Sequence, residues 1–318
     1  MYLLYALFTA FVVAAVTGLG LLLYCSPKPR KPTEQEGYYV DKTKQKHKLP
    51  SILDDASVRL SCIVPAFDET KRLPVMLEET VGHLESRQKS DPKFTYEIII
   101  VDDGSRDNTV ELALDLAKKY NKVDLRVLAL EKNRGKGGAV TQGMLAARGQ
   151  ICLMVDADGA TKFSDLDALE AKLMKSEENG YGIAVGSRAH LVSTDAVVQR
   201  SFIRNFLMRG FHQLVYILGI RGIEDTQCGF KLFTRKAAQL IFPNMHVERW
   251  IFDIECLVIA QAHRIPIVEV PVTWHEIDGS KVNLMRDSIQ MALDLLTIRL
   301  NFLLGFWKVD SIKKQKSQ

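Results

Sequence analysis

Short apolar runs alternate with helical segments between Val58 and Val155, and this alternation constrains the fold more than any other feature of the sequence. The apolar runs are Arg59–Pro65, Tyr96–Val101, Leu125–Leu130 and Ile151–Val155, and the segments with helical spacing are Leu73–Leu84, Thr109–Tyr120 and Gly137–Ala147. Nearly continuous apolar strands separated by helices are typical of a parallel sheet that is covered on both faces. We therefore expect an α/β fold whose ligands lie beyond the carboxyl ends of the strands.

Acidic residues follow three of these predicted strands. They are Asp68 and Glu69 after the first strand, Asp102 and Asp103 after the second, and Asp156 and Asp158 after the strand that begins at Ile151. Because the carboxyl ends of parallel strands meet at one edge of a sheet, we expect these side chains to lie close together. An ionised carboxylate can only accept hydrogen bonds, which suits ribose hydroxyls and the polar edge of a base.

Asp156 and Asp158 lie one residue apart at the end of an apolar strand, and Gly159 follows them. Side chains alternate along an extended backbone, so both carboxylates project to the same side. They repel each other unless a cation lies between them, and oxygen ligands suit Mg²⁺ or Mn²⁺. Such an ion takes its other ligands from water and a substrate phosphate, so the pair predicts a metal-diphosphate site. The alternative is that both aspartates only cap turns.

The segment Gly135–Gly138 opens the predicted helix after the third strand, and Lys136 lies within it. Backbone amides at the start of a helix, together with the lysine ammonium, would face a phosphate. A flexible turn with a solvated lysine is the alternative. No GxGxxG sequence follows the first strand, which argues against a nicotinamide-dependent oxidoreductase.

The segment Leu3–Leu23 contains no charged residue. About 20 helical residues cross the ~30 Å hydrocarbon core of a membrane, so we expect residues 1–25 to form a transmembrane helix. A cleaved signal peptide is the competing interpretation, but its apolar region is shorter than this. The basic run Lys28–Lys31 follows, and the positive-inside rule then places the rest of the chain in the cytosol. Residues 26–57 are expected to form a stiff, mostly irregular linker.

Composition argues against two other kinds of protein. The net charge of +4 is small, and basic residues do not gather beside aromatic ones, so nothing indicates a nucleic-acid partner. The five cysteines are odd in number and lie mostly inside apolar runs, which favours neither a disulfide framework nor a CxxC metal site. We expect the bulk of the chain in a reducing compartment.

The segments PAFDE, VDDGSRDNT, NRGKGGA and DADGA occur in this order between Val58 and Lys281. Together they resemble the inverting nucleotide-sugar glycosyltransferases of the GT-A fold. The resemblance implies a Rossmann-like, mainly parallel sheet with helices on both faces, in a glycosyltransferase domain of residues 58–282. The N-terminal membrane helix and the segment VTWHEIDGSKVNL are most similar to the eukaryotic branch that acts on polyprenyl phosphates.

The same resemblance implies a reaction and a location. The enzyme would transfer glucose from UDP-glucose to dolichyl phosphate with inversion, and it would require Mg²⁺ or Mn²⁺. It would be a single-pass protein of the endoplasmic reticulum membrane, with a cytosolic catalytic domain, and its product would donate glucose in protein N-glycosylation. The alternatives are a mannosyltransferase that uses GDP-mannose, and a non-catalytic nucleotide-binding scaffold at the membrane.

The resemblance also implies roles for individual residues on the donor side. Asp68 and Asp103 would hold the uridine, with Asp102 beside them, and Pro65 and Glu69 would shape the wall of that subsite. Lys136 would approach a phosphate, Asp156 and Asp158 would take the ribose-diphosphate and the metal, and Lys281 would close over the diphosphate. Asp158 is the first choice as direct metal ligand.

On the acceptor side, Arg188 resembles the position that binds the acceptor phosphate in the polyprenyl-phosphate branch. Arg200 and Arg204 follow at roughly the spacing of the family, and arginine binds phosphate bidentately. A solvated or headgroup-facing helix side is the alternative for these two arginines. Asp225 resembles the general base of many members. A lipid phosphate with a second pKa of about 6 is largely dianionic at neutral pH, however, so Asp225 would instead hold the acceptor or an arginine.

Two features near the C-terminus complete the sequence-based predictions. Arg249 and Trp250 resemble the end of the QxxRW sequence of processive polysaccharide synthases, but His246 replaces the glutamine, which argues against such an enzyme. Asp253 and Glu255 after them either line the site or are ordinary acids at a helix start. Residues 283–318 contain an apolar segment interrupted by charges, which predicts an interfacial helix rather than a spanning one, and packing on the core is the alternative.

Overall fold

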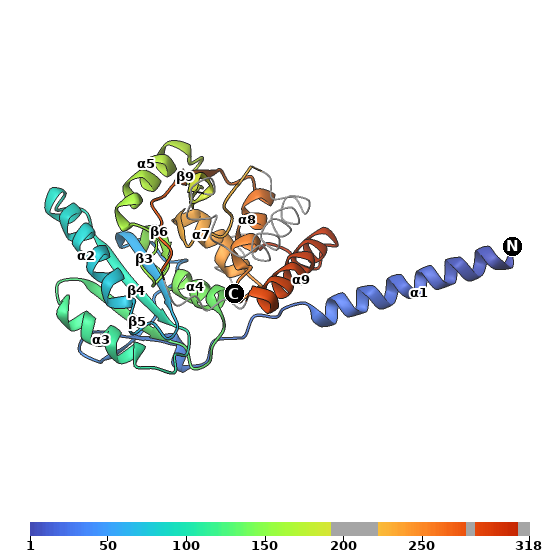
Figure 1. The fold of residues 1–318 in the computed structure, drawn as a ribbon, viewed down its shortest axis with the longest axis horizontal. Helices are drawn as coiled ribbons and strands as arrows, with labels where there is room; N and C mark the ends of the chain where they lie inside the picture. The colour runs from blue at the N-terminus through green and yellow to red at the C-terminus, as the bar shows by residue number, and fades with distance from the viewer. Residues whose placement is uncertain (192–221, 278–283, 311–318) are drawn as a thin grey trace.

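The computed structural model describes residues 1–318 except 192–221, 278–283 and 311–318 (Figure 1). Within the described residues, one nine-stranded sheet has the order β2-β1-β5-β4-β3-β6-β8-β7-β9. The strands are β1 Tyr38–Val40, β2 Lys46–Lys48, β3 Val58–Ala66, β4 Tyr96–Asp102, β5 Asp124–Ala129, β6 Gly149–Val155, β7 Ile183–Ser187, β8 Phe230–Thr234 and β9 Ile267–Pro271. The helices are α1 Tyr2–Cys25, α2 Leu73–Ser90, α3 Thr109–Lys119, α4 Lys136–Leu145, α5 Leu166–Ser176, α7 Arg235–Ile241, α8 Phe252–Ala262 and α9 Leu284–Leu303.

The centre of the sheet is parallel, as the sequence predicted. Strand β3 pairs in parallel with β4 and β6, and β4 pairs in parallel with β5. Strand β8 runs antiparallel between β6 and β7, which the alternation of strands and helices did not predict. Strand β7 therefore runs in the same direction as β6, and β8 begins at the edge where both of them end.

Helices cover both faces of the sheet, because side chains alternate along each strand and most side chains of the central strands are apolar. In β3, Leu60, Cys62 and Val64 face a core that also contains residues of α2, α3 and α5. Ile63 faces the opposite core, with residues of α4, α7 and α8 and with Leu295 of α9. The mainly parallel, doubly covered sheet confirms the predicted fold class (Figure 1).

The segment between α1 and β3 differs from the expected irregular linker. Strands β1 and β2 form a hairpin, and Val40 of β1 pairs with Val127 at the edge of β5. A short 3-10 helix, Gln35–Gly37, precedes the hairpin, and Glu36 within it is only 1% exposed. Part of residues 26–57 therefore belongs to the folded domain.

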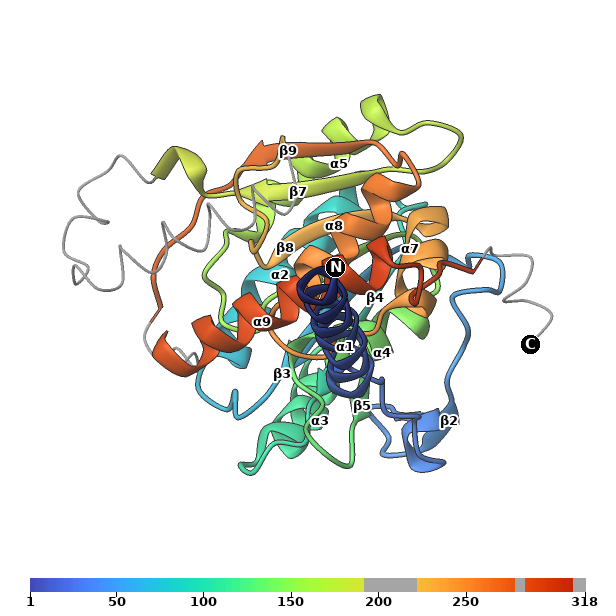
Figure 2. The same cartoon turned by 90° about the vertical axis from the view of Figure 1, so that its right-hand side faces the viewer.

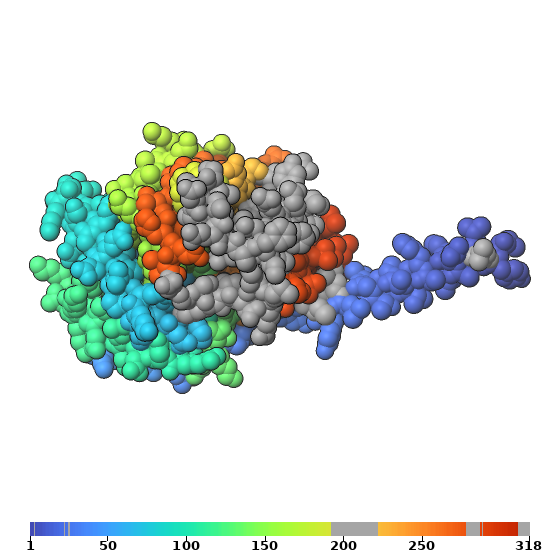
Figure 3. Space-filling view, viewed as in Figure 1, coloured from blue at the N-terminus to red at the C-terminus, as the bar shows by residue number. Residues whose placement is uncertain are grey.

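Helix α1 extends away from the folded domain (Figures 1 and 3), and it is long and apolar enough to cross a membrane. Helix α9 lies next to the end of α1 (Figure 2), where Asn301 Nδ2 donates a hydrogen bond of 2.8 Å to Ser26 Oγ. Ile298 of α9 is buried in the core, whereas Leu293 and Leu296 are exposed. Helix α9 thus packs on the domain with one side and presents apolar side chains on the other.

Candidate active site

The carboxyl ends of β3, β4, β6 and β7 lie at one edge of the sheet, and β8 begins there. This topology brings together most of the predicted site residues. From the donor side they are Pro65, Asp68, Glu69, Asp102, Asp103, Lys136, Asp156 and Asp158, and from the acceptor side they are Arg188 and Asp225. Arg200, Arg204 and Lys281, which the sequence also predicted, lie outside the described residues.

Asp156 and Lys136 form an ion pair at the centre of this edge. The Nζ atom of Lys136 lies 2.7 Å from Oδ1 and 2.8 Å from Oδ2 of Asp156. Burial alone would lower the pKa of Lys136, but attraction to Asp156 and to other carboxylates outweighs it and raises that pKa. Gly135 turns the chain into α4 with a φ of 88°, and a Cβ there would lie 2.6 Å from the carbonyl oxygen of Glu248. A glycine is therefore required immediately before the lysine.

Asp158 lies next to Asp156 in an environment that disfavours its ionised form, which a bound cation would favour. Burial, and next the repulsion from Asp156, raise the pKa of Asp158. Its Oδ1 atom accepts a hydrogen bond of 2.9 Å from the amide of Ala160, so the predicted turn-capping contact is present as well. Within the described residues no three His, Cys, Asp or Glu side chains form a preformed metal site. A divalent ion that uses two carboxylates and draws its other ligands from a diphosphate and water fits this arrangement.

Gly229, just before β8, leaves room for the Asp156 carboxylate. The amide of Asp156 donates a hydrogen bond of 3.1 Å to the carbonyl oxygen of Gly229. A Cβ atom at Gly229 would overlap the Asp156 carboxylate. No local sequence pattern indicates this role, because it depends on the antiparallel pairing of β8 with β6.

Asp103 organises the loop before α4. Its Oδ1 atom accepts a hydrogen bond of 2.7 Å from the amide of Arg134, and its Oδ2 atom accepts one of 2.9 Å from the amide of Gly135. The side chain is nearly inaccessible, and burial raises the pKa of Asp103 to about 6 although the two amides act in the other direction. Burial also raises the pKa of Asp102, whose buried Oδ1 has no hydrogen-bond partner in the described part of the chain.

Asp68 and Glu69 lie in the turn that follows β3. Pro65, near the end of β3, pairs with Val101 of β4. Asp68 has a φ of 51°, and its Oδ1 atom accepts a hydrogen bond of 2.7 Å from the amide of Arg106. Glu69 holds the guanidinium of Arg72 in a fork, with distances of 2.6 and 2.7 Å.

Arg72 lies near the aspartate pair, and the sequence-based prediction did not include it. The hydrogen bonds that Arg72 donates to Glu69 raise the pKa of Arg72 in spite of burial, and Asp158 and Asp156 contribute further attraction. Arg72 therefore belongs to the electrostatic surroundings of the aspartate pair. The Glu-x-x-Arg spacing at the start of a helix was the signal that could have indicated a fixed guanidinium.

Arg188 and Asp225 form the second ion pair of the site. The Nε and Nη2 atoms of Arg188 lie 2.7 and 2.9 Å from the two carboxylate oxygens of Asp225. The Arg188 amide donates a third hydrogen bond, of 2.9 Å, to the same carboxylate. Burial alone would raise the pKa of Asp225, but the hydrogen bonds from Arg188 lower it. An ionised carboxylate with both oxygens occupied is suited to fixing the arginine, not to removing a proton.

Glu269 and Trp274 complete this side of the site and were not predicted. The carboxylate of Glu269, in β9, accepts hydrogen bonds of 2.8 and 2.9 Å from the amides of Glu224 and Asp225. The guanidinium of Arg188 lies 5.5 Å from the ring centroid of Trp274. Two strand ends and one loop thus fix the position of Arg188.

The acids of α8 lie beneath the site. Asp253 is 2% exposed and forms an ion pair of 2.6 Å with the buried Lys231. Glu255 is fully buried and accepts hydrogen bonds from the amides of His246 and Val247. Neither acid lines the site, and both are more buried than ordinary helix-start acids.

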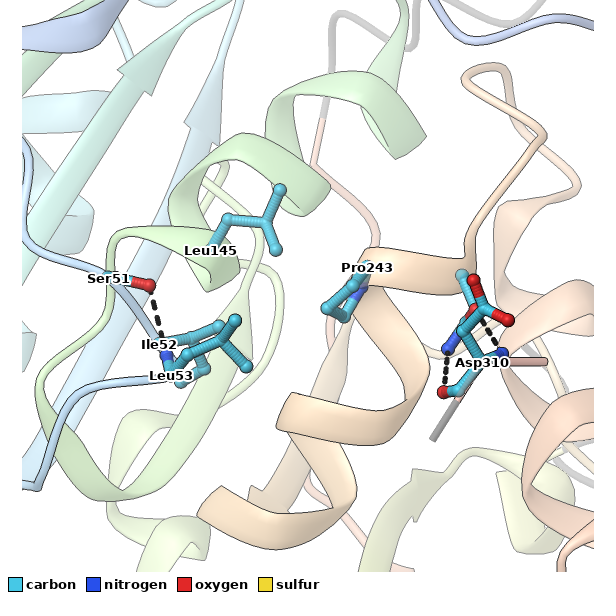
Figure 4. A pocket seen from close by; sticks show the side chains of 7 residues that line it. Ser51, Ile52, Leu53, Leu145, Pro243 and Asp310 are labelled. Carbon is cyan, nitrogen blue, oxygen red and sulfur yellow. Dashed lines mark hydrogen bonds between the residues drawn. The ribbon is translucent and has the colours of Figure 1, made fainter. Parts of the chain in front are cut away.

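A cavity of about 340 Å³ lies at the opposite edge of the sheet (Figure 4). It is lined by Ser51, Ile52, Leu53, Leu145, Pro243, Asn244 and Asp310. Leu145 ends α4 just before the amino end of β6, so this cavity is separate from the cluster of charged residues at the carboxyl edge.

Comparison with known proteins identifies the family. The model of glycosyl transferase family 2 matches residues 61–242. A dolichyl-phosphate beta-glucosyltransferase from Dictyostelium discoideum is 51% identical over 283 residues, which cover 87% of this chain and 86% of that protein. A protein of the same name from Homo sapiens is 50% identical over 88% of this chain and 87% of that protein. One from Saccharomyces cerevisiae is 46% identical over 95% of this chain and 94% of that protein.

Solved structures share the fold. Glucosyl-3-phosphoglycerate synthase from Mycobacterium tuberculosis in complex with UDP has a TM-score of 0.52 and 15% identity, over 76% of this chain and 80% of that chain. A complex of that enzyme with Mn²⁺, UDP-glucose and phosphoglyceric acid has a TM-score of 0.50 and 17% identity over the same shares. The family match and the close relatives confirm the resemblance carried by the sequence motifs: this chain is a glycosyltransferase of family 2 and belongs to the dolichyl-phosphate beta-glucosyltransferases.

Proposed function

We propose that the protein transfers glucose from UDP-glucose to dolichyl phosphate with inversion at the anomeric carbon. The observation that carries the proposal is the meeting, at one sheet edge, of the Asp156–Lys136 ion pair with the Arg188–Asp225 ion pair. The first suits a sugar diphosphate and the second suits a phosphate monoester. The names of the close relatives and the UDP and UDP-glucose bound by the structural neighbours support the same reaction.

On the donor side, Asp68 and Asp103 would hold the uridine, with Pro65, Glu69 and Asp102 around them. Asp156 and Asp158 would hold Mg²⁺ or Mn²⁺ together with the diphosphate. The ion would supply positive charge that stabilises the departing UDP.

Lys136 and Arg72 would add further positive charge beside the diphosphate, because both already lie within the field of the two aspartates. Stabilisation of charge that develops on the leaving group acts mainly on turnover.

On the acceptor side, the guanidinium of Arg188 would orient the phosphate of the lipid, and Asp225 would fix Arg188. The lipid phosphate is already largely dianionic at neutral pH, so no general base is needed. One phosphate oxygen forms a bond to the anomeric carbon while the bond from that carbon to the UDP oxygen breaks and UDP leaves with the electron pair. A single in-line attack on an alpha-linked donor gives a beta-linked product.

For location, we place α1, residues 1–25, across the endoplasmic reticulum membrane and the glycosyltransferase domain, residues 58–282, in the cytosol. Residues 26–57 connect them, and residues 283–318 provide α9 and the tail. The exposed Leu293 and Leu296 of α9 would rest on the membrane surface, where an isoprenoid acceptor lies. The product, dolichyl beta-D-glucosyl phosphate, would donate glucose in protein N-glycosylation.

The test is incubation of the membrane-reconstituted protein with labelled donors and a polyprenyl phosphate. UDP-glucose with Mn²⁺ should give a beta-linked lipid product, whereas GDP-mannose should give none. Equal turnover with GDP-mannose would contradict the donor assignment, and an alpha-linked product would contradict the single attack. Binding of UDP-glucose without any transfer would favour a membrane scaffold over an enzyme.

A further inference from the structure

The juxtamembrane segment Arg30–Glu36, between α1 and β1, packs against the loop that precedes α4. The amide of Glu131 donates a hydrogen bond of 3.0 Å to Glu36 Oε1. The Nη2 atom of Arg134 donates one of 2.6 Å to the carbonyl oxygen of Arg30. These contacts join residues about a hundred positions apart, so they belong to the tertiary structure of the domain rather than to a loose linker.

Glu36 is the centre of this contact. Its carboxylate accepts hydrogen bonds from the side chain of Arg30 and, at 3.0 Å, from the amide of Thr33. The Glu36 amide in turn donates a hydrogen bond of 3.4 Å to Thr33 Oγ1. This reciprocal pair of hydrogen bonds between Thr33 and Glu36 is the pattern of a capping box. Burial alone would raise the pKa of Glu36, but these donors outweigh it and lower that pKa. The side chain is therefore an ionised acceptor in a fixed position.

The loop that Glu36 holds leads directly to the donor side of the active site. Arg134 uses its Nε atom to donate a hydrogen bond of 2.8 Å to Glu248, and its amide is one of the two that bind Asp103. Lys136, two residues further on, carries the ammonium that contacts Asp156. Displacement of this loop would move both the Asp103 contacts and the Lys136 ammonium.

We propose that Glu36 is a positioning residue for the sugar-nucleotide donor, because it fixes the Glu131–Lys136 loop against the juxtamembrane segment. This inference rests on the proposed function, since it takes a nucleotide diphosphate as the ligand of that loop. The N-terminal region would then consist of more than a membrane anchor and a linker. Helix α1 provides location, whereas Arg30–Glu36 forms part of the support of the donor site.

The test compares a buried carboxylate, Glu36, with a partly buried one, Glu170, in the full-length protein reconstituted in detergent. Glu36→Gln keeps the shape of the side chain but removes its charge. Glu170→Gln is the matched control. Glu170 forms ion pairs with two arginines, Arg59 and Arg87, but lies away from the site. The measurements are UDP affinity with Mn²⁺ by calorimetry, the KM for each substrate, kcat, and amide hydrogen exchange of residues 131–138.

Glu36→Gln should weaken UDP binding and raise the donor KM by roughly five- to tenfold, the effect of losing one charge-assisted hydrogen bond. The acceptor KM should stay within about twofold, and exchange of residues 131–138 should become faster. Glu170→Gln should change none of these. If Glu36→Gln fails to fold, Arg30→Gln should give the same donor-specific shift at a smaller size, because it keeps the hydrogen bond that the Glu131 amide donates to Glu36.

Wild-type UDP affinity and donor KM in a folded Glu36→Gln protein would overturn the inference and leave the proposed function standing. An equal loss in Glu36→Gln and Glu170→Gln, accompanied by equal falls in melting temperature, would also overturn it, since the effect would then be general destabilisation. Absence of UDP binding by the wild-type protein would refute the proposed donor, and with it the role of Glu36.

Discussion

The proposed donor and acceptor halves of the site differ in how their charged groups are paired. In the donor half, burial and next repulsion from Asp156 raise the pKa of Asp158, so ionisation of the second aspartate is disfavoured. In the acceptor half, Arg188 and Asp225 neutralise each other, and hydrogen bonding lowers the pKa of the aspartate and raises that of the arginine in spite of burial. From this difference we infer that the proposed donor half would bind an added cation, whereas the ion pair of the proposed acceptor half is already formed within the chain.

The largest expected effect follows from removing charge in the donor half. Asp158→Asn keeps the shape of the side chain but removes one charged metal ligand, so kcat should fall by about 100- to 1000-fold. Chelation of divalent ions in the wild-type protein should produce a similar loss. Full turnover of Asp158→Asn with saturating donor would show that the aspartates only cap turns, and the contrast between the two halves would disappear.

A smaller loss is expected from crowding the same carboxylate. In Gly229→Ala the new methyl group would overlap the Asp156 carboxylate, so the side chain must move and UDP affinity with Mn²⁺ should fall about tenfold.

Gly82→Ala is the matched control for this variant, because nothing lies within 4 Å of the added methyl group in α2. This control should keep UDP affinity and gain about 0.5–1 kcal/mol in the free energy of unfolding. Unchanged affinity in Gly229→Ala would mean that the position of Asp156 is not critical.

In the acceptor half, Arg188→Lys keeps the positive charge but loses the fork that binds Asp225. The KM for the polyprenyl phosphate should rise by about five- to tenfold, the effect of losing a charge-assisted hydrogen bond, while UDP affinity stays unchanged. Steady-state kinetics with each substrate varied in turn would measure both values. A rise confined to the donor KM would contradict the assignment of Arg188 to the acceptor half.

The smallest effect concerns pH and Asp103. Its pKa is about 6 in the folded protein against an ordinary value of 3.8, so between these values the folded state keeps a proton that the unfolded state has lost. Stability should therefore decrease as the pH rises through this range and level off above about pH 6.

Donor affinity should change in the opposite direction, because only the ionised Asp103 accepts hydrogen bonds from both amides. Titration with UDP-glucose at several pH values should show weaker binding below about pH 6. Asp103→Asn should flatten this dependence. The same pH profile in the variant would exclude Asp103 as its source.

The two halves also differed in how well the sequence predicted them. Acids that directly follow apolar strands mark the donor half, so Asp103, Asp156 and Asp158 could be placed at one edge from strand direction alone. Contacts between distant segments create the acceptor half: Arg188 pairs with Asp225, 37 positions away, and Glu269 binds that loop from β9. No local pattern contains this information.

The same limit explains the other differences. The antiparallel strand β8, and with it the role of Gly229, depends on pairing between segments about 80 residues apart, which strand and helix periodicity does not report. The hairpin β1–β2 was interpreted as linker because its strands have three residues each and two of the three residues in β2 are lysines. Glu36 was not predicted as a site residue because its partners, Glu131 and Arg134, lie about a hundred positions further along the chain.

The most direct test of the division into two halves is a calorimetric titration of UDP with and without Mn²⁺ into wild type, Asp158→Asn and Arg188→Lys. We predict that Mn²⁺ strengthens UDP binding in the wild type and in Arg188→Lys to the same extent, and that this gain is lost in Asp158→Asn. An Mn²⁺-dependent gain that persists in Asp158→Asn, or that disappears in Arg188→Lys, would contradict the assignment of the cation to the donor half.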